Sequence, residues 1–287
     1  MYQETITLNN GVIVPQLALG TWLIDDDKVG DAVKEAVKLG YRHIDTAQAY
    51  GNERGIGQAL KEIFIPREEI FITSKVAAEN KSYDSAAKSI DETLTKMGLD
   101  YIDMMIIHSP QPWKEVNQSD NRYFKENKEV WRALEDAYHA GKIRAIGISN
   151  FLEEDLDNLL EDCQVKPMVN QILCHIANTP LDLINYCKQH DIALEAYSPV
   201  AHGAALTDPK IAEIAQKYQV TVPQLCIKYD LQLGMITLPK TANPEHMKAN
   251  GEMDFVISDE DMEVLKHVEH IKDYGKGRIF PVYGGKL

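Results

Sequence analysis

Short apolar runs alternate with amphipathic helical patterns along most of this 287-residue chain, and that alternation limits the possible folds more than any other feature. Several runs are apolar almost throughout, which is typical of strands covered on both faces, as in a parallel sheet. The eight expected strands are Gln16–Gly20, Tyr41–Asp45, Ile70–Lys75, Tyr101–His108, Ile143–Ser149, Met168–Gln171, Ile192–Tyr197 and Met235–Pro239. Eight strands that alternate with helices predict an α/β fold, the (β/α)8 TIM barrel.

The segments between the runs have the apolar spacing of helices that pack one face against a sheet. Glycine, a residue suited to end a helix, follows three of these patterns. The patterns and their glycines are Val29–Val37 with Gly40, Ala87–Met97 with Gly98, and Trp131–Tyr138 with Gly141. No low-complexity run or Pro/Gly-rich linker divides the sequence, so we expect a single domain over residues 1–287.

A doubly wound dinucleotide-binding sheet is the competing fold. It requires a G-x-G-x-x-G turn after the first strand, whereas Gly55-Ile-Gly57 lacks the third glycine and lies inside a helical pattern. The opening segment, Ile6–Val14, contains an Asn-Gly pair between apolar residues and is predicted to be a β-hairpin. We expect this hairpin to close the bottom of the barrel.

Charge and composition narrow the class of partner. The net charge of −14 argues against a nucleic acid or an anionic membrane, because both require a basic surface. No stretch approaches the roughly 20 apolar residues that span a bilayer, and the first residues do not look like a secretion signal. The four cysteines are far apart and are expected to be reduced, so we expect a cytoplasmic protein.

Polar side chains stand at the carboxyl ends of three consecutive predicted strands. Asp45, Lys75 and His108 end the second, third and fourth strands, and Tyr50 follows Asp45 in a short loop. Chemistry in such barrels is located at this end, and neighbouring strands lie only about 4.8 Å apart. We therefore expect the four side chains to converge.

The chemistry of these four residue types is specific. A free tyrosine titrates near pH 10, and a neighbouring ammonium such as Lys75 favours the phenolate. A carboxylate such as Asp45 would keep a buried lysine charged, and His108 can donate a hydrogen bond to a carbonyl oxygen. Taken alone, the Asp–Lys pair is as readily explained by a structural role as by a catalytic one. A lone histidine on an apolar strand is more often a core residue than a catalytic one. Together they predict a general acid beside a polarised carbonyl.

Over nearly its whole length the chain resembles the aldo-keto reductase family, and most closely its bacterial 2,5-diketo-gluconate reductase and aldehyde or methylglyoxal reductase branch. The segments that carry the resemblance are Leu19-Gly-Thr-Trp22, Gly40-Tyr-Arg-His-Ile-Asp-Thr-Ala-Gln-Ala-Tyr-Gly-Asn-Glu53, Ile72-Thr-Ser-Lys75, Asp100–His108, Gly141–Phe151, Ala196-Tyr-Ser-Pro199 and Leu238-Pro-Lys-Thr241. The resemblance implies reduction of aldehydes or ketones by NADPH, without a metal. It also implies that Asp45, Tyr50, Lys75 and His108 are the catalytic tetrad, with Tyr50 as the proton donor.

The resemblance also implies a set of cofactor-binding residues. Ser149, Asn150 and Gln171 are expected to bind the carboxamide of the nicotinamide, and Tyr197 to stack on its ring. At the adenosine end, Lys240 and Thr241 are expected to bind phosphate. The full expected set is Thr21, Ser149, Asn150, Gln171, Tyr197, Ser198, Lys240, Thr241, His246 and Asn250.

Two departures from the family pattern bear on the cofactor. His246 stands where the family has an arginine, and Ala249 where it has a glutamate. A guanidinium can hold the ribose 2′-phosphate while always charged, whereas a histidine is mostly neutral at pH 7. We therefore expect NADPH to be preferred and NADH to be accepted as well. The loop at Ser198–Gly203, expected to cover the pyrophosphate, has Ala201 close to where the family usually has glycine.

On the substrate side, Trp22, His108 and Trp113 are expected to line the pocket for a small carbonyl compound. Residues 111–127 form a long polar segment that is either a substrate lid or plain surface. The short glycine-rich C-terminus predicts a wide, permissive site. Two other functions stay open: a non-catalytic cofactor-binding or regulatory relative, and a metal-dependent hydrolase using Asp45 and His108. We expect a monomer, with a weak dimer as the alternative.

Overall fold

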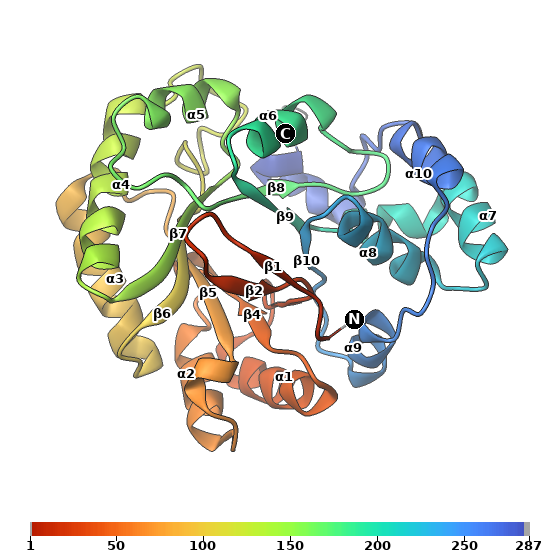
Figure 1. Cartoon of the computed structure of the whole chain (residues 1–287), viewed down its shortest axis with the longest axis horizontal. Coiled ribbons are helices and arrows are strands. Elements are labelled where there is room, and N and C mark those ends of the chain that lie inside the picture. The colour runs from red at the N-terminus through yellow and green to blue at the C-terminus, as the bar shows by residue number, and fades with distance from the viewer. Residues whose placement is uncertain (1, 284–287) are drawn as a thin grey trace.

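Eight parallel strands form the barrel that the alternating pattern predicted (Figure 1). The computed structural model describes residues 2–283. The barrel strands are β3 (Leu19–Gly20), β4 (His43–Asp45), β5 (Phe71–Val76), β6 (Ile102–Ile107), β7 (Ile143–Ser149), β8 (Val169–Leu173), β9 (Ala193–Tyr197) and β10 (Ile236–Leu238). Each pairs with the next in chain order, and parallel bridges from Leu17 to Thr237 and from Gly20 to Lys240 join the first strand to the last.

Helices surround the barrel on the outside, as Figure 1 shows. Their bounds are α1 (Asp26–Leu39), α2 (Glu53–Glu62), α3 (Tyr83–Met97), α4 (Phe124–His139), α5 (Glu153–Leu160), α6 (Leu181–Gln189), α7 (Pro209–Lys217), α8 (Val222–Gln232), α9 (Pro244–Gly251) and α10 (Asp259–Lys266). The predicted helix ends are confirmed at Gly40 and Gly98, which have left-handed φ of 113° and 65° and donate to carbonyl groups of the preceding turn.

Apolar side chains fill the space between strands and helices. All six residues of β5 and all six of β6 are buried, which agrees with strands covered on both faces. On α1 the buried positions repeat at helical spacing from Val29 to Val37. Burial of a valine, isoleucine or methionine side chain stabilises the fold by about 1.5–3 kcal/mol relative to exposure. The polar side chains at the strand ends depend on this scaffold for their placement.

Gly55 and Gly57, which lack the third glycine of a dinucleotide-binding turn, lie in α2 and permit close packing of neighbouring helices. A Cβ on Gly55 would lie 2.1 Å from the carbonyl oxygen of Asp26, and one on Gly57 would lie 2.3 Å from that of Met97. These positions exclude any side chain, because α1 and the end of α3 approach the α2 backbone there. The glycines are therefore explained by helix packing.

The predicted hairpin closes one end of the barrel. Strands β1 (Thr5–Thr7) and β2 (Ile13–Pro15) pair antiparallel and cross the near end of the barrel in Figure 1. The side chain of Asn9 donates to the carbonyl oxygens of Pro167 and Asp191, and that of Asn10 donates to Arg144. Pro167 and Asp191 lie two residues before β8 and β9, so the hairpin covers the amino ends of the strands, as expected.

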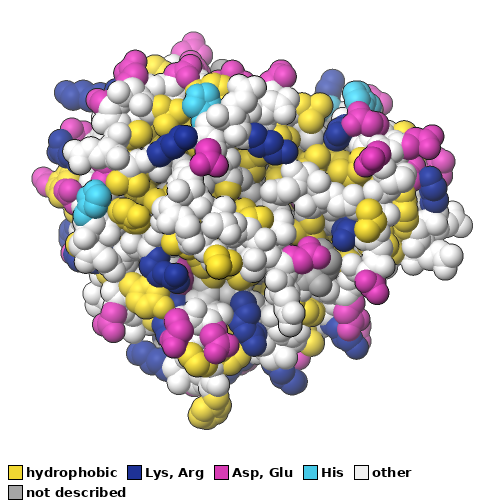
Figure 2. Space-filling model, in the orientation of Figure 1, with side chains coloured by type: hydrophobic (Ala, Val, Ile, Leu, Met, Phe, Trp, Pro, Cys, Tyr) yellow, Lys and Arg dark blue, Asp and Glu magenta, His cyan; other side chains and the backbone are white. Residues whose placement is uncertain are grey.

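The face seen in Figure 2 carries lysine and arginine side chains interspersed with carboxylates. No helix in residues 2–283 is both long enough and apolar enough to cross a membrane. All four cysteines are free thiols, and three of them are buried.

Candidate active site

Lys75 and Asp45 form a buried ion pair at the carboxyl ends of β5 and β4. The Lys75 ammonium donates to Asp45 Oδ1 and to the Thr46 carbonyl oxygen, each over 2.7 Å. The lysine side chain has no exposed surface and the aspartate side chain is only 5% exposed. Burial alone would lower the pKa of Lys75, but the attraction of Asp45 and Tyr50 outweighs it and raises that pKa. Lys75 is therefore charged in the folded protein.

Tyr50 ends the single 3-10 turn η1 (Gln48–Tyr50), between β4 and α2. The Lys75 Nζ lies 4.9 Å from the centre of the Tyr50 ring. Burial raises the pKa of Tyr50 to about 12, and Lys75 opposes this rise. Lys75 lowers the pKa of Tyr50, as expected, but desolvation of the buried phenol raises that pKa by more. Tyr50 thus holds its proton at neutral pH.

His108 follows β6 and completes the predicted group of four. Its ring lies 5.6 Å from that of Tyr50 and 4.8 Å from that of Trp113, edge to face in both pairs. Burial and the nearby Lys75 hold the pKa of His108 well below its usual value. The imidazole is therefore neutral at pH 7, and its enclosed Nδ1 has no hydrogen-bond partner among the described residues. The structure brings all four side chains together, as the strand positions predicted.

Polar residues expected to bind the cofactor carboxamide lie beside this group, at the ends of β7, β8 and β9. Ser149 Oγ donates to the Gln171 carbonyl oxygen over 2.8 Å. Asn150, with a left-handed φ of 61°, donates through Nδ2 to the His108 carbonyl oxygen. Its Oδ1 accepts a 2.7 Å hydrogen bond from the Tyr197 hydroxyl. These contacts hold the expected carboxamide site against the His108 backbone.

Gln171 reaches across the inside of the barrel. Its Nε2 donates to Asp45 Oδ2 over 3.1 Å and to Glu195 Oε2 over 2.8 Å. Glu195 was not among the residues singled out from the sequence, although a carboxyl group inside the apolar run Ile192–Tyr197 was a visible signal. It is fully buried, and burial followed by repulsion from Asp45 raises its pKa to about 8.

The residues expected at the adenosine end differ in their exposure. Lys240, two residues after β10, and His246 on α9 are both exposed. Thr241 is nearly buried, and its Oγ1 accepts a hydrogen bond from the Asn243 amide. Asn250 is buried, and its side chain hydrogen-bonds to the Tyr41 hydroxyl.

Thr21 lies at the barrel end itself, where its hydroxyl donates to the Asp45 carbonyl oxygen over 2.9 Å. This hydrogen bond ties the backbone after β3 to the aspartate that pairs with Lys75. Thr21 is thereby placed beside the group of four, and its neighbour Gly20 forms a parallel bridge with Lys240.

The C-terminal segment borders the site more closely than the sequence predicted. The turns η4 (Gly275–Ile279) and η5 (Pro281–Tyr283) place Phe280 4.5 Å from the Trp22 ring and bring the Tyr283 hydroxyl within 2.7 Å of Ser198 Oγ. Trp22 therefore packs against this segment, as part of an aromatic wall. The remainder of the glycine-rich tail, residues 284–287, lies outside the described residues.

The loop between β9 and α7 contains the turn η3 (Ala201–Thr207) and an unusual backbone. Ser198, Ala201 and His202 all have φ near +50° to +56°. Left-handed backbone costs a non-glycine residue about 1–2 kcal/mol, so the alanine found near the family's glycine position has an energetic consequence. The His202 ring stacks on that of Tyr283 at 5.9 Å, and this packing helps to hold the loop.

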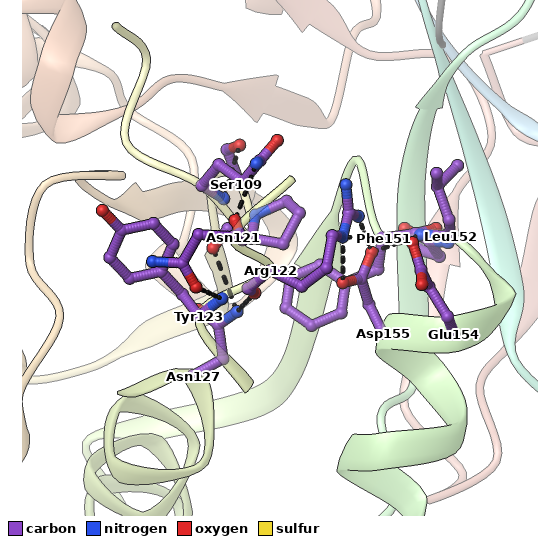
Figure 3. A network of polar contacts seen from close by, with 12 residues as sticks. Ser109, Asn121, Arg122, Tyr123, Asn127, Phe151, Leu152, Glu154 and Asp155 are labelled. Carbon is purple, nitrogen blue, oxygen red and sulfur yellow. Dashed lines mark hydrogen bonds and ion pairs between the residues drawn. The ribbon is translucent and has the colours of Figure 1, made fainter. Parts of the chain in front are cut away.

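The long polar segment after His108 is fastened to the start of α5 (Figure 3). The Arg122 guanidinium and the buried Asp155 carboxylate point toward one another and form a two-point ion pair, with Nε donating to Oδ1 over 2.9 Å. Asp155 Oδ2 also accepts from the Leu152 amide, at the first turn of α5. Because α5 follows Ser149 and Asn150, this pair connects the segment that carries Trp113 to the expected carboxamide site.

Within residues 2–283, no three His, Cys, Asp or Glu side chains are grouped so that they could hold a metal ion. Asp45 is already paired with Lys75 and Gln171, and the His108 ring packs against the rings of Tyr50 and Trp113. The donor set therefore gives no support to the metal-dependent hydrolase considered from the sequence.

Comparison with known proteins gives a consistent result. The model of the Aldo/keto reductase family matches residues 16–270. Glyoxal reductase from Bacillus subtilis is 40% identical over 265 residues, covering 92% of each chain. A Brucella melitensis aldo/keto reductase structure has a TM-score of 0.85 at 38% identity, covering 92% of this chain and 98% of its own. A Bombyx mori aldo-keto reductase in complex with NADP has a TM-score of 0.83 at 32% identity, covering 98% and 99%.

Proposed function

Because the chain belongs to the aldo/keto reductase family, we propose that it reduces small aldehydes, ketones or dicarbonyl compounds to alcohols, with NADPH as the preferred reductant. The similarity to a glyoxal reductase favours dicarbonyls among the possible substrates. The Bombyx relative seen with NADP supports the choice of cofactor. The alternative is a relative that binds the cofactor without turning over a substrate.

The observation that carries the proposal is the convergence of Tyr50, Lys75, Asp45 and His108 at one end of the barrel. A phenol that keeps its proton, a buried ammonium beside it and a neutral imidazole make a site for protonating a polarised carbonyl. A protein that only bound the cofactor would gain nothing from a fully buried lysine, since desolvation of that charge costs free energy.

The residues present fit a nicotinamide cofactor. Ser149, Asn150 and Gln171 gather hydroxyl and amide groups at one place, and the Tyr197 hydroxyl is fixed by Asn150, which sets the orientation of its ring. We assign the carboxamide to the first three and the ring to Tyr197. When bound, the reduced nicotinamide supplies a hydride to the carbonyl carbon of the substrate.

The proton comes from Tyr50 in this proposal. Its hydroxyl protonates the carbonyl oxygen, and the phenolate left behind is stabilised by the Lys75 ammonium, which Asp45 keeps charged and in place. His108, neutral and beside both Tyr50 and Trp113, donates a hydrogen bond that orients the same oxygen. Trp22 and Trp113 would then form walls around the substrate.

At the adenosine end, we assign the phosphate groups to Lys240 and Thr241, with His246 and Asn250 completing the site. We assign Ser198 to the loop over the pyrophosphate. Lys240 and His246 are exposed and can reach a bound phosphate, whereas Asn250 is engaged by Tyr41. Replacement of the family's arginine by His246 weakens the selection of the 2′-phosphate, so NADH is expected to be accepted.

The test is an assay of NADPH consumption with methylglyoxal and phenylglyoxal, repeated with NADH and in the presence of EDTA. Reduction that continues in EDTA supports the proposal. Cofactor binding without turnover of any member of a carbonyl panel would favour the non-catalytic alternative. We also propose one domain over residues 1–287, a monomer and a cytoplasmic location; light scattering tests the oligomeric state.

A further inference from the structure

The Gln171 side chain connects two carboxyl groups from strands that are not neighbours in the barrel. Asp45 is on β4 and Glu195 is on β9, which neighbours β8, the strand of Gln171. The same nitrogen, Nε2, lies within 3.1 Å of an oxygen of the first and 2.8 Å of an oxygen of the second. Together these contacts use both N–H groups of the amide.

The chemistry of the neighbours decides which way the amide faces. An amide has two N–H donors on nitrogen and only acceptor capacity on oxygen. The ionised Asp45 can only accept, so an amide oxygen turned toward it would be repelled. The nitrogen must therefore face the two carboxyl groups. Oε1 is left without a hydrogen bond from any described residue.

Strand register places Glu195 directly beside Gln171. It pairs with Gln171 in the parallel ladder between β8 and β9 and with Ile236 on the other side. It is fully buried, and its second oxygen, Oε1, has no hydrogen-bond partner among the described residues. A buried carboxyl group with one unsatisfied oxygen is destabilising, and within residues 2–283 the hydrogen bond from Gln171 is the one that Glu195 accepts.

We propose that Glu195 is a positioning residue: together with Asp45 it fixes the Gln171 amide with nitrogen turned toward the carboxyl groups, so that Oε1 accepts a hydrogen bond from the carboxamide NH2 of the nicotinamide. This inference rests on the proposed function, because it requires a nicotinamide cofactor beside Gln171. It assigns a role to a residue that does not touch the cofactor itself.

The test compares two dinucleotides that differ at the group concerned. NADP+ carries a carboxamide NH2, whereas the 3-acetylpyridine analogue of NADP+ carries a methyl group in its place and cannot donate. Dissociation constants are measured at equilibrium, from quenching of protein fluorescence, for the wild type, Glu195→Leu, Glu195→Ala, Glu195→Gln and Gln171→Leu. One hydrogen bond corresponds to a preference of the wild type for NADP+ of roughly threefold to tenfold.

The expected pattern is specific to an orienting role. The ratio of the two dissociation constants should fall toward one in Gln171→Leu. It should also fall in whichever of Glu195→Leu and Glu195→Ala folds, as judged by circular dichroism. Glu195→Gln should keep it, because an amide oxygen at position 195 still accepts from Gln171. Asp230→Leu is the matched control: it removes another buried carboxyl group, far from Gln171 in sequence and bonded to Thr237, and should leave the preference unchanged.

Three results would overturn the inference. The first is a wild type that binds NADP+ and its 3-acetylpyridine analogue equally well. The second is a preference for NADP+ that survives loss of the Glu195 carboxyl group, although Gln171→Leu abolishes it. The third is a preference that Glu195→Gln reduces as much as Glu195→Leu does. If the wild type binds neither dinucleotide, the proposed function itself is wrong and this inference falls with it. That outcome is distinct, because it concerns binding and not the ratio between the two ligands.

Discussion

Lys75 Nζ lies 2.7 Å from Asp45 Oδ1 in a part of the barrel where the lysine side chain has no contact with solvent. Each charge would be costly to bury alone, so the two ions depend on one another for their charged state. Tyr50 in turn depends on Lys75, the one group that lowers the pKa of its phenol through both charge and a hydrogen bond. The proton donor is thus the last member of a chain of three.

Replacing Tyr50 by phenylalanine should abolish carbonyl reduction and leave cofactor binding nearly unchanged. The substitution removes the only proposed proton donor, and general acid catalysis contributes about a hundredfold to ten-thousandfold to a rate. The cofactor is assigned to residues from other loops, so its dissociation constant should stay within about twofold of wild type. Steady-state kinetics test the loss of carbonyl reduction, and fluorescence titration tests the unchanged binding of the cofactor. A mutant that loses cofactor affinity and keeps turnover would show that another group is the acid.

The Lys75→Met variant should lose activity by about a hundredfold to a thousandfold, because the phenolate formed on proton transfer is no longer stabilised by a buried charge. Asp45→Asn should be less damaging to turnover, since the ammonium keeps its hydrogen bond to Thr46. It should nevertheless destabilise the fold by about 3–5 kcal/mol, the cost of breaking a buried pair on one side. Urea denaturation measures that loss. Equal kinetic defects in the two variants would mean that Asp45 has a direct part in the chemistry.

The barrel and its four central side chains could be predicted because both follow from local patterns. Apolar runs give strands, and most strand ends fall within two residues of the expected positions; the first is the exception, since only Leu19–Gly20 of Gln16–Gly20 is regular strand. Once the strands are in order, Asp45, Lys75 and His108 must lie at neighbouring strand ends. Their convergence required no knowledge of side-chain packing.

The parts that could not be predicted depend on contacts between distant segments. The hydrogen bond between Ser198 and Tyr283 joins residues 85 positions apart, and Gln171 meets Asp45 across 126 positions. The direction in which the pKa of Tyr50 shifts depends on how completely the site is enclosed. The pattern of strands in a sequence does not reveal that enclosure. Glu195 is a related case: its carboxyl group was visible in the sequence, but its partner was not.

Replacing His246 by arginine should widen the preference for NADPH over NADH. In the wild type we expect that preference, measured as the ratio of kcat/KM values, to stay below about a thousandfold, or roughly 4 kcal/mol. A guanidinium on the exposed first turn of α9 can pair with the 2′-phosphate in two places, which should increase the ratio by about tenfold or more. The change should appear in the KM for NADPH. A wild-type ratio well above a thousandfold would contradict the prediction.

Asp155→Ala should raise the KM for the carbonyl substrate several-fold, because it releases the Arg122 guanidinium and the segment that holds Trp113 beside His108. Loss of the carboxylate also leaves the Leu152 amide without its acceptor, so stability should fall by about 1–3 kcal/mol. The matched control is Glu154→Ala, which removes the exposed partner of Arg122 at 3.3 Å and should have little effect. An unchanged KM in Asp155→Ala would mean that the ion pair does not position this segment.

The Glu195→Gln variant should gain stability relative to the wild type as the pH rises from about 5 to about 8. In the unfolded chain a glutamate loses its proton near pH 4.5, whereas burial and the neighbouring Asp45 raise the pKa of folded Glu195 to about 8. Between these values the folded protein holds one proton more than the unfolded chain, so its stability decreases with pH by up to about 1.4 kcal/mol per unit. The hydrogen bond from Gln171 and the charge of Lys75 partly offset this rise in the pKa. Gln171 and Ile236, the neighbours of Glu195 in the sheet, do not titrate.

Glutamine at position 195 removes this titration, so the difference in unfolding free energy between variant and wild type should grow up to about pH 8 and then level off. Urea denaturation at several pH values measures it, and Glu68→Gln, on the exposed turn η2 (Arg67–Glu69), is the control that should show a flat difference. A flat difference for Glu195→Gln as well would mean that the folded protein keeps Glu195 ionised. Gln171 would then donate to two full negative charges, and Lys75 alone would have to balance both.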